Sequence, residues 1–350
     1  ASAMAVMADQ NTCPWGFSAV KDLSSEPRRG WVNSINYSYY PTIQVFWENC
    51  YDAISLVNDV LRVLDINGED FGDEGSDTQM LKAWSYFISG IAHGYLGLTF
   101  DRANIVRGNY ETDSIEFSAW QNMIDVSLEL LDKAISIADG NSFIISAEWM
   151  GGETYTNYEL SVLANSYAAR ILAYSSRNKA HNENIDWERV LKYTNNGIQK
   201  DLSPELGDNY DFYDMFTVYS RYPGWARIDH RIINLMDPNY PSYWPQTYVW
   251  QQNQRLLLWL TPNGQDPGPA ESEDARLKSD FEYLQENSFP PDRGFYHFSH
   301  YRYKRYDAVF SGVWYGNAPK PSMLVWENEM LKAEALIRTG NISGAVSILN

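Results

Sequence analysis

Aromatic side chains set among Pro, Asn, Gln and Gly are the residues of this chain best suited to bind a ligand. Flat amphipathic rings offer apolar faces to the C–H surfaces of sugars, and neighbouring amide and guanidinium groups can hydrogen-bond sugar hydroxyls. Most such rings are expected to pack internally, but a few exposed together would form a site. The rings concerned are Trp225, Tyr240, Tyr243, Trp244, Tyr248, Trp250, Trp259, Trp314 and Tyr315.

Motifs for catalysis or metal binding are weak by comparison. The acidic run 65–77 has Asp70 and Ser76 where a calcium loop of the EF-hand type needs Gly and Glu, so we interpret it as a solvated loop. His297 and His300 have a metal-clamping spacing, but aromatic residues surround them and no carboxylate pair is near. We therefore expect no metal and no cofactor. Among 45 acidic residues, an acid/base pair of the glycosidase type is not excluded.

The charge and hydropathy of the chain disfavour some classes of binding partner. A net charge of −18 and a pI of about 4.6 disfavour nucleic acid and anionic lipid surfaces. No apolar run approaches the roughly twenty residues of a membrane-spanning helix. No signal peptide is visible, although both ends look trimmed, because the chain starts and stops inside apolar helical sequence. Cys13 and Cys50 allow either one disulfide or two free thiols.

Apolar residues at helical spacing dominate the rest of the chain, which must position the aromatic residues. Apolar residues recur at helical spacing in five segments, with capping pairs expected at Ser76/Gln79, Ser118/Gln121 and Thr156/Glu159 and a cap at Asp186. The segments are 41–64, 76–95, 118–138, 156–172 and 186–198. A closing hairpin, 327–350, contains an Ala-rich helix, a Gly340-Asn341 break and a second helix. Paired helices of this kind predict an all-α, tetratricopeptide-like repeat frame.

Two loop-rich stretches interrupt this frame. Residues 203–323 hold 12 of the 15 prolines and 25 of the 52 aromatic residues, a composition typical of ordered loops rather than of helices or disorder. Residues 11–41 form a smaller aromatic loop. We therefore expect one domain over 1–350, with a helical frame over 1–202, a ligand-binding insertion over 203–323 and a closing hairpin over 324–350.

Four segments in this order resemble the SusD/RagB-type surface glycan-binding lipoproteins of Bacteroidetes nutrient-uptake systems. The closing LKAEALIRTGNISGAVSILN is similar to that family's signature, and GIAHGYLGLTFDRANIV to its second conserved helix and exit loop. Met7-Ala8-Asp9-Gln10 resembles the family's acidic turn, with Gln10 in place of the usual acid, and ARIDHRIINLMDPNY fits its Asp-x-Arg segment. The resemblance covers essentially the whole chain.

The resemblance implies a non-catalytic protein on the cell surface. It would be held at the outer membrane by an N-terminal lipid anchor, capture an oligosaccharide and deliver it to a SusC-like TonB-dependent transporter barrel. Its binding residues would come from the first loop and the long insertion: Trp15, Arg28, Arg29, Trp31, Trp225, Tyr240, Tyr243, Trp244, Trp250, Trp314 and Tyr315. In our hypothesis Trp244, Tyr240, Tyr243 and Trp31 stack on the bound sugar.

Two other readings remain open at this point. A peptide-binding member of the same family, or a helical-repeat adaptor, would retain peptides but no glycans. An (α/α)-barrel glycoside hydrolase would also be helical, acidic and rich in Trp, and it would release reducing sugars.

Overall fold

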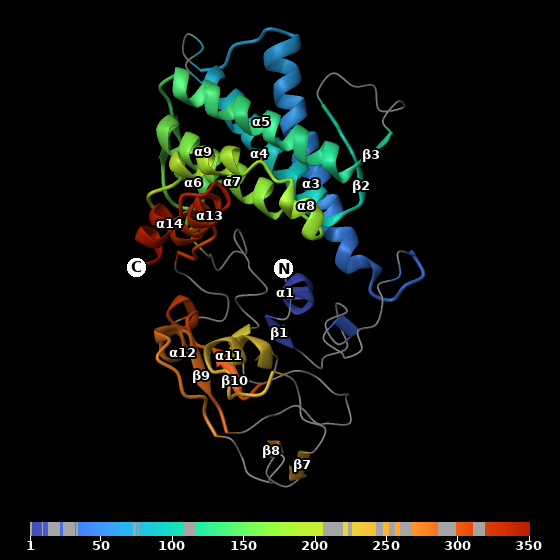
Figure 1. Ribbon diagram of the computed structural model, residues 1–350. Helices are drawn as coiled ribbons and strands as arrows, with labels where there is room; N and C mark the ends of the chain where they lie inside the picture. Colours follow the sequence, from blue (N-terminus) through green and yellow to red (C-terminus); the bar gives the residue numbers. More distant parts are fainter. Residues whose placement is uncertain are drawn as a thin grey trace. The chain divides into compact units, whose positions relative to one another are not determined.

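The chain divides into two compact units. The computed structural model describes residues 2–8, 10–12, 22–23, 32, 34–72, 75, 77–107, 116–205, 220–222, 226–242, 248–251, 256–259, 268–285, 299–310 and 319–350. Unit 1 comprises Ala1–Gln44 with Glu205–Pro319, and unit 2 comprises Val45–Pro204 with Lys320–Asn350 (Figure 1). The expected aromatic loop and most of the expected insertion therefore belong to unit 1.

Unit 2 is an array of paired helices. The long helices α4 (Thr78–Thr99), α5 (Trp120–Gly140) and α7 (Asn157–Tyr174) pack in succession, followed by α9 (Trp187–Asn195), α13 (Val325–Arg338) and α14 (Ile342–Leu349) (Figure 1). Helix α3 (Tyr40–Leu61) continues into a π-helical turn, Arg62–Ile66, and α6 (Ala147–Met150) and α8 (Lys179–Glu183) are short. The helical frame predicted from periodicity is confirmed.

Side-chain caps set several helix starts in unit 2. Thr156 and Glu159 form the expected capping box, and the Asp186 carboxylate accepts from the Arg189 N–H at 2.9 Å. Asn341 caps α14 through the Gly344 N–H, after Gly340 has ended α13 at a φ of 87°. The cap expected at Ser118 is wrong, since α5 begins at Trp120 after Ala119 and Ser118 pairs in a strand instead. Ser76 lies outside the described residues.

Short antiparallel strand pairs close the turns of unit 2. Strand β2 (Arg102–Asn104) pairs with β3 (Phe117–Ala119), and β4 (Ile144–Ile145) with β5 (Tyr155–Thr156). Cys50 carries a free, half-buried thiol on α3, and burial raises its pKa to about 11. Cys13 lies outside the described residues. Among the described helices, none has the length and apolar content that crossing a bilayer requires.

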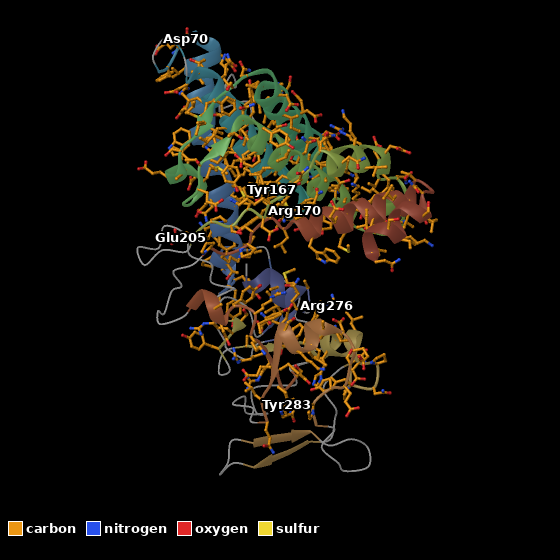
Figure 2. The ribbon with its side chains drawn as sticks, turned by 90° about the vertical axis from the view of Figure 1, so that its left-hand side faces the viewer. Asp70, Tyr167, Arg170, Glu205, Arg276 and Tyr283 are labelled. Atoms are coloured by element: carbon orange, nitrogen blue, oxygen red, sulfur yellow. The ribbon has the colours of Figure 1, made fainter. Side chains whose placement is uncertain are left out.

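The returning segment 320–350 is fixed to the frame through buried polar contacts. Asn328 Oδ1 accepts from the Ser166 hydroxyl at 2.9 Å, and its amide donates to the Thr194 carbonyl at 3.0 Å. Beside it, Arg170 forms a bidentate pair with Glu327 and lies over the Tyr167 ring at 5.2 Å (Figure 2). These contacts join α13 to α7 and α9, which lie more than a hundred residues earlier in the chain.

In its described residues, unit 1 combines short helices with three antiparallel strand pairs. Its helices are α1 (Ser2–Met7), α11 (His230–Met236) and α12 (Ala275–Ser279), with a 3-10 turn at Asp307–Phe310. The strand pairs are β1 (Asn11–Thr12) with β6 (Arg227–Ile228), β7 (Tyr248–Gln251) with β8 (Leu256–Trp259), and β9 (Phe281–Tyr283) with β10 (Tyr301–Tyr303). Its core residues are Ile228, Ile233, Tyr240, Leu277, Phe281, Tyr301 and Tyr303.

The two ends of the long unit 1 segment 205–319 are joined by β-bridges. Leu202 forms a β-bridge with Met323 within unit 2, and the Leu202 N–H donates to the Met323 carbonyl at 2.9 Å. Three residues further along, Glu205 forms a second bridge, with Pro319, within unit 1. The two ends of 205–319 therefore lie side by side.

Candidate functional site

Most of the residues expected to bind ligand fall outside the part of the chain that the structure describes. These are Trp15, Arg28, Arg29, Trp31, Trp225, Tyr243, Trp244, Trp314 and Tyr315. Trp250 lies on β7, where only its backbone is described. Their role in binding remains a prediction.

Tyr240 lies in the core of unit 1, not at the surface as we expected. Its side chain is 3% exposed, and its ring packs edge-on against Tyr301 at 5.9 Å and beside His230 at 5.6 Å. The turn after α11 holds it there, because the Tyr240 N–H donates to the Asp237 carbonyl at 2.9 Å. A ring packed on both sides in this way supports a site but offers no face for stacking on a ligand.

A groove of about 730 Å³ lies on unit 1, lined by described residues. We call it the unit 1 groove. It runs between segment 269–273, helix α12 and the β9–β10 strand pair. Its lining residues are Pro269, Ala270, Glu271, Ser272, Glu273, Leu277, Lys278, Phe281, Glu282, Tyr283 and Tyr301. Its volume falls in the range of about 300–1,000 Å³ typical of ligand sites.

Hydrogen bonds to neighbouring elements fix segment 269–273 along one side of the groove. The Ala270 N–H donates to the Tyr301 hydroxyl at 2.7 Å, and the Glu271 N–H to an Asp237 carboxylate oxygen at 2.9 Å. The Ser272 hydroxyl donates to the Met236 carbonyl at 2.6 Å. The backbone of this segment is thereby held in place, and the side chains of Glu271 and Glu273 are exposed.

Tyr283 is the half-buried aromatic ring of the groove. It stands opposite Tyr301 in the β9–β10 pair, with the two rings edge to face at 5.5 Å, and it stacks on His300 at 5.5 Å with an interplanar angle of 20° (Figure 2). His300 is itself buried, and its Nδ1 lies 2.9 Å from the Leu284 carbonyl. Tyr283 is therefore placed by its neighbours rather than left to rotate.

Charges around the groove are mostly negative. Glu282 pairs with Arg302 at 2.5 Å, and Arg302 also forms a bidentate pair with Asp307 at 2.8 Å for both bonds. Asp274, at the start of α12, has its pKa held at about 2 by its hydrogen bonds with Arg276. Within the described part of the chain, neither Glu271 nor Glu273 forms an ion pair.

A second concavity, on unit 2, is smaller. It has a volume of about 180 Å³ and lies between the start of α7 and residues 198–200, with Tyr155, Tyr158 and Lys200 among its lining residues. This volume is below the usual size of a ligand site. The unit 1 groove is therefore the better candidate.

The lining of the groove has groups that are suited to contact a polar ligand. Its tyrosine wall offers an apolar face, and its carboxylates accept hydrogen bonds from hydroxyl groups. No group of three or more His, Cys, Asp or Glu side chains in the described residues could hold a metal, and His297 is not among them. Tyr283, Glu271 and Glu273 were not singled out from the sequence. The alternation Phe-Glu-Tyr at 281–283 and Tyr-Arg-Tyr at 301–303 was the available signal.

Comparisons with known proteins give structural matches only. No protein-family model matches the sequence, and no curated protein matches it. A SusD-like protein from Bacteroides fragilis matches with a TM-score of 0.60 and 15% identity, over 100% of this chain and 74% of its own. A SusD homologue from Parabacteroides distasonis matches with a TM-score of 0.63 and 13% identity, over 99% of this chain and 66% of its own. A laminarin-binding SusD-like protein matches with a TM-score of 0.50 and 15% identity, over 99% of this chain and 77% of its own.

These likenesses establish the fold. This chain spans 74%, 66% and 65% of the first three structures that it matches. The resemblance drawn from the four sequence segments is thus confirmed as a shared architecture, which is not that of an (α/α)-barrel. The chain has the fold of the SusD-like proteins, with a tetratricopeptide-like helical frame.

Proposed function

We propose that this protein is a non-catalytic carbohydrate-binding protein that holds an oligosaccharide in the unit 1 groove. The observation that carries the proposal is Tyr283, a half-buried ring fixed by His300 and Tyr301 at the wall of a ligand-sized concavity. Exposed carboxylates at Glu271 and Glu273 supply acceptors for sugar hydroxyls beside that ring.

The fold supports this proposal. One of the similar structures is a laminarin-binding SusD-like protein, so the architecture accommodates glycan binding. By the resemblance, the protein acts at the outer-membrane surface through an N-terminal lipid anchor and passes its ligand to a SusC-like TonB-dependent transporter. The expected aromatic residues, including Trp31 and Trp244, remain proposed as further contacts to the same ligand.

Affinity gel electrophoresis tests glycan binding directly. The protein is run through native gels that contain laminarin, starch, xylan, mannan or inulin, and we expect at least one to retard it. Tyr283→Ala should then weaken binding by about two- to twelvefold, because a lost ring contact is worth about 0.5–1.5 kcal/mol and 1.4 kcal/mol is tenfold. Tyr158→Ala, at a tyrosine 60% exposed on unit 2, is the matched control and should leave retardation unchanged.

Two outcomes would count against the proposal. Retention of a peptide library together with no retardation by any polysaccharide would favour the peptide-binding alternative. Release of reducing sugar during incubation with the same panel would show that the protein is an enzyme.

A further inference from the structure

We propose that the unit 1 groove selects uncharged glycans and rejects anionic ones, such as polymers of uronic acids, through the carboxylates of Glu271 and Glu273. This inference rests on the proposed function, since it concerns the same groove. It names the chemical class of the ligand, which the fold alone does not.

The lining of the groove carries an excess of negative charge. Among the described residues it contains three glutamates, Glu271, Glu273 and Glu282, against one basic residue, Lys278. Of the three, Glu282 is compensated by Arg302 at 2.5 Å. Glu271 and Glu273 are exposed, and neither forms an ion pair with any described residue.

Nearby basic side chains are already engaged. Arg276 is held by Asp274 at 2.6 Å, and Arg302 is shared between Glu282 and Asp307. Lys304 donates to the Lys278 carbonyl at 3.0 Å. Lys278 is thus the one described cation of the lining, and it forms no ion pair with Glu271 or Glu273.

The backbone keeps the two carboxylates at the groove. The Glu271 N–H is tied to Asp237, and Ser272 between the two glutamates is tied to Met236. A carboxylate on a sugar bound in the groove would thus meet like charge. Such a juxtaposition disfavours binding, and the effect is stronger where water is excluded. The net charge of −18 adds a long-range repulsion of the same sign.

A matched pair of polysaccharides isolates this effect. Each neutral polysaccharide that retards the protein is compared with its own carboxymethylated derivative, which differs in charge on the same backbone. We expect the derivative to bind at least about tenfold more weakly in 20 mM salt, and the difference to shrink in 300 mM salt as screening increases.

Two variants assign the selectivity to the groove. Glu271→Gln/Glu273→Gln keeps the size and one acceptor oxygen of each side chain while it removes both charges, and it should bring the ratio of the two affinities to within about threefold. Lys278→Gln should widen the ratio, because it removes the only basic residue of the lining. Glu183→Gln/Glu188→Gln, at exposed positions on unit 2, changes net charge equally and should leave the ratio unchanged.

The outcomes separate this inference from the function on which it rests. If no neutral polysaccharide is bound, the proposed function fails first. If neutral and carboxymethylated forms bind the wild type equally, the function stands and the selectivity is overturned. If the unit 2 control relieves the discrimination as much as the groove variant does, the selectivity belongs to net charge and not to Glu271 and Glu273.

Discussion

At the scale of single residues, His93 shows how burial fixes a protonation state. It lies on α4 with no exposed surface, its Nδ1 is 2.8 Å from the Ser89 carbonyl, and its Nε2 is 3.4 Å from the Val106 nitrogen. A carbonyl only accepts and an amide N–H only donates, so a neutral ring with its proton on Nδ1 satisfies both partners. Burial lowers the pKa of His93 to about 4, partly opposed by the Ser89 hydrogen bond.

This depressed pKa predicts a loss of stability in mild acid. The unfolded chain binds a proton at the ordinary value of 6.5, whereas the folded chain resists it until about 4. The free energy of unfolding is therefore unaffected above pH 6.5 and should fall by up to about 3 kcal/mol as the pH drops from 6.5 to 4. The free energy of unfolding, measured by urea melts at several pH values between 6.5 and 4, should depend less steeply on pH in His93→Gln than in the wild type. His181→Gln is the control and should show the same pH dependence as the wild type. The same pH dependence in His93→Gln and the wild type would refute the assignment.

At the scale of helices, glycines on one face of α4 let α5 and α7 approach closely. A Cβ added at Gly94 would lie 2.5 Å from Ile171 Cδ1 and 2.7 Å from Ser127 Oγ, and one at Gly90 would lie 2.8 Å from Leu131 Cγ. The Ser127 hydroxyl donates to the Gly90 carbonyl at 2.6 Å across the same contact. The crossing of these helices therefore depends on the absence of side chains at 90 and 94.

Gly94→Ala should consequently destabilise the protein. Forcing one methyl group into a packed helix crossing typically costs about 1–3 kcal/mol. Gly140→Ala, at the end of α5 where no atom lies within 4 Å, is the matched control and should change stability by less than about 0.5 kcal/mol. Denaturant titration followed by circular dichroism measures both. Equal stability of the two variants would mean that α4 and α5 have room to separate.

At the scale of the whole molecule, unit 2 is completed by residues that arrive more than a hundred positions later in the chain. Asn328→Ala should lower the free energy of unfolding by about 1–3 kcal/mol, because it leaves the buried Ser166 hydroxyl without its acceptor and removes one hydrogen bond to the Thr194 carbonyl. Asn196→Ala removes an exposed asparagine that bonds only its own helix at Lys192 O, so it should have little effect. A similar loss in both variants, measured by thermal denaturation, would contradict this role for Asn328.

The helical frame could be predicted from the sequence, but the unit 1 groove could not, and the reasons are physical. Helical periodicity and the caps at Thr156, Asp186 and Asn341 are local signals, and each lies where it was predicted. The groove depends on contacts between distant segments, such as Ala270 with Tyr301, which no local pattern encodes. Composition marked Tyr240 as a candidate ring, but only the fold shows that it is packed between Tyr301 and His230.

The paired ends of 205–319 carry a consequence for how this protein can diversify. Since Leu202 and Met323 are bridged within the frame, the chain leaves and returns at one point, whatever lies between. Insertions, deletions or recombination inside that stretch would not displace α9 or α13. A related protein could therefore acquire a new specificity by changing the loops of this stretch while it inherits the same helical frame, provided that β6 keeps its pairing with β1.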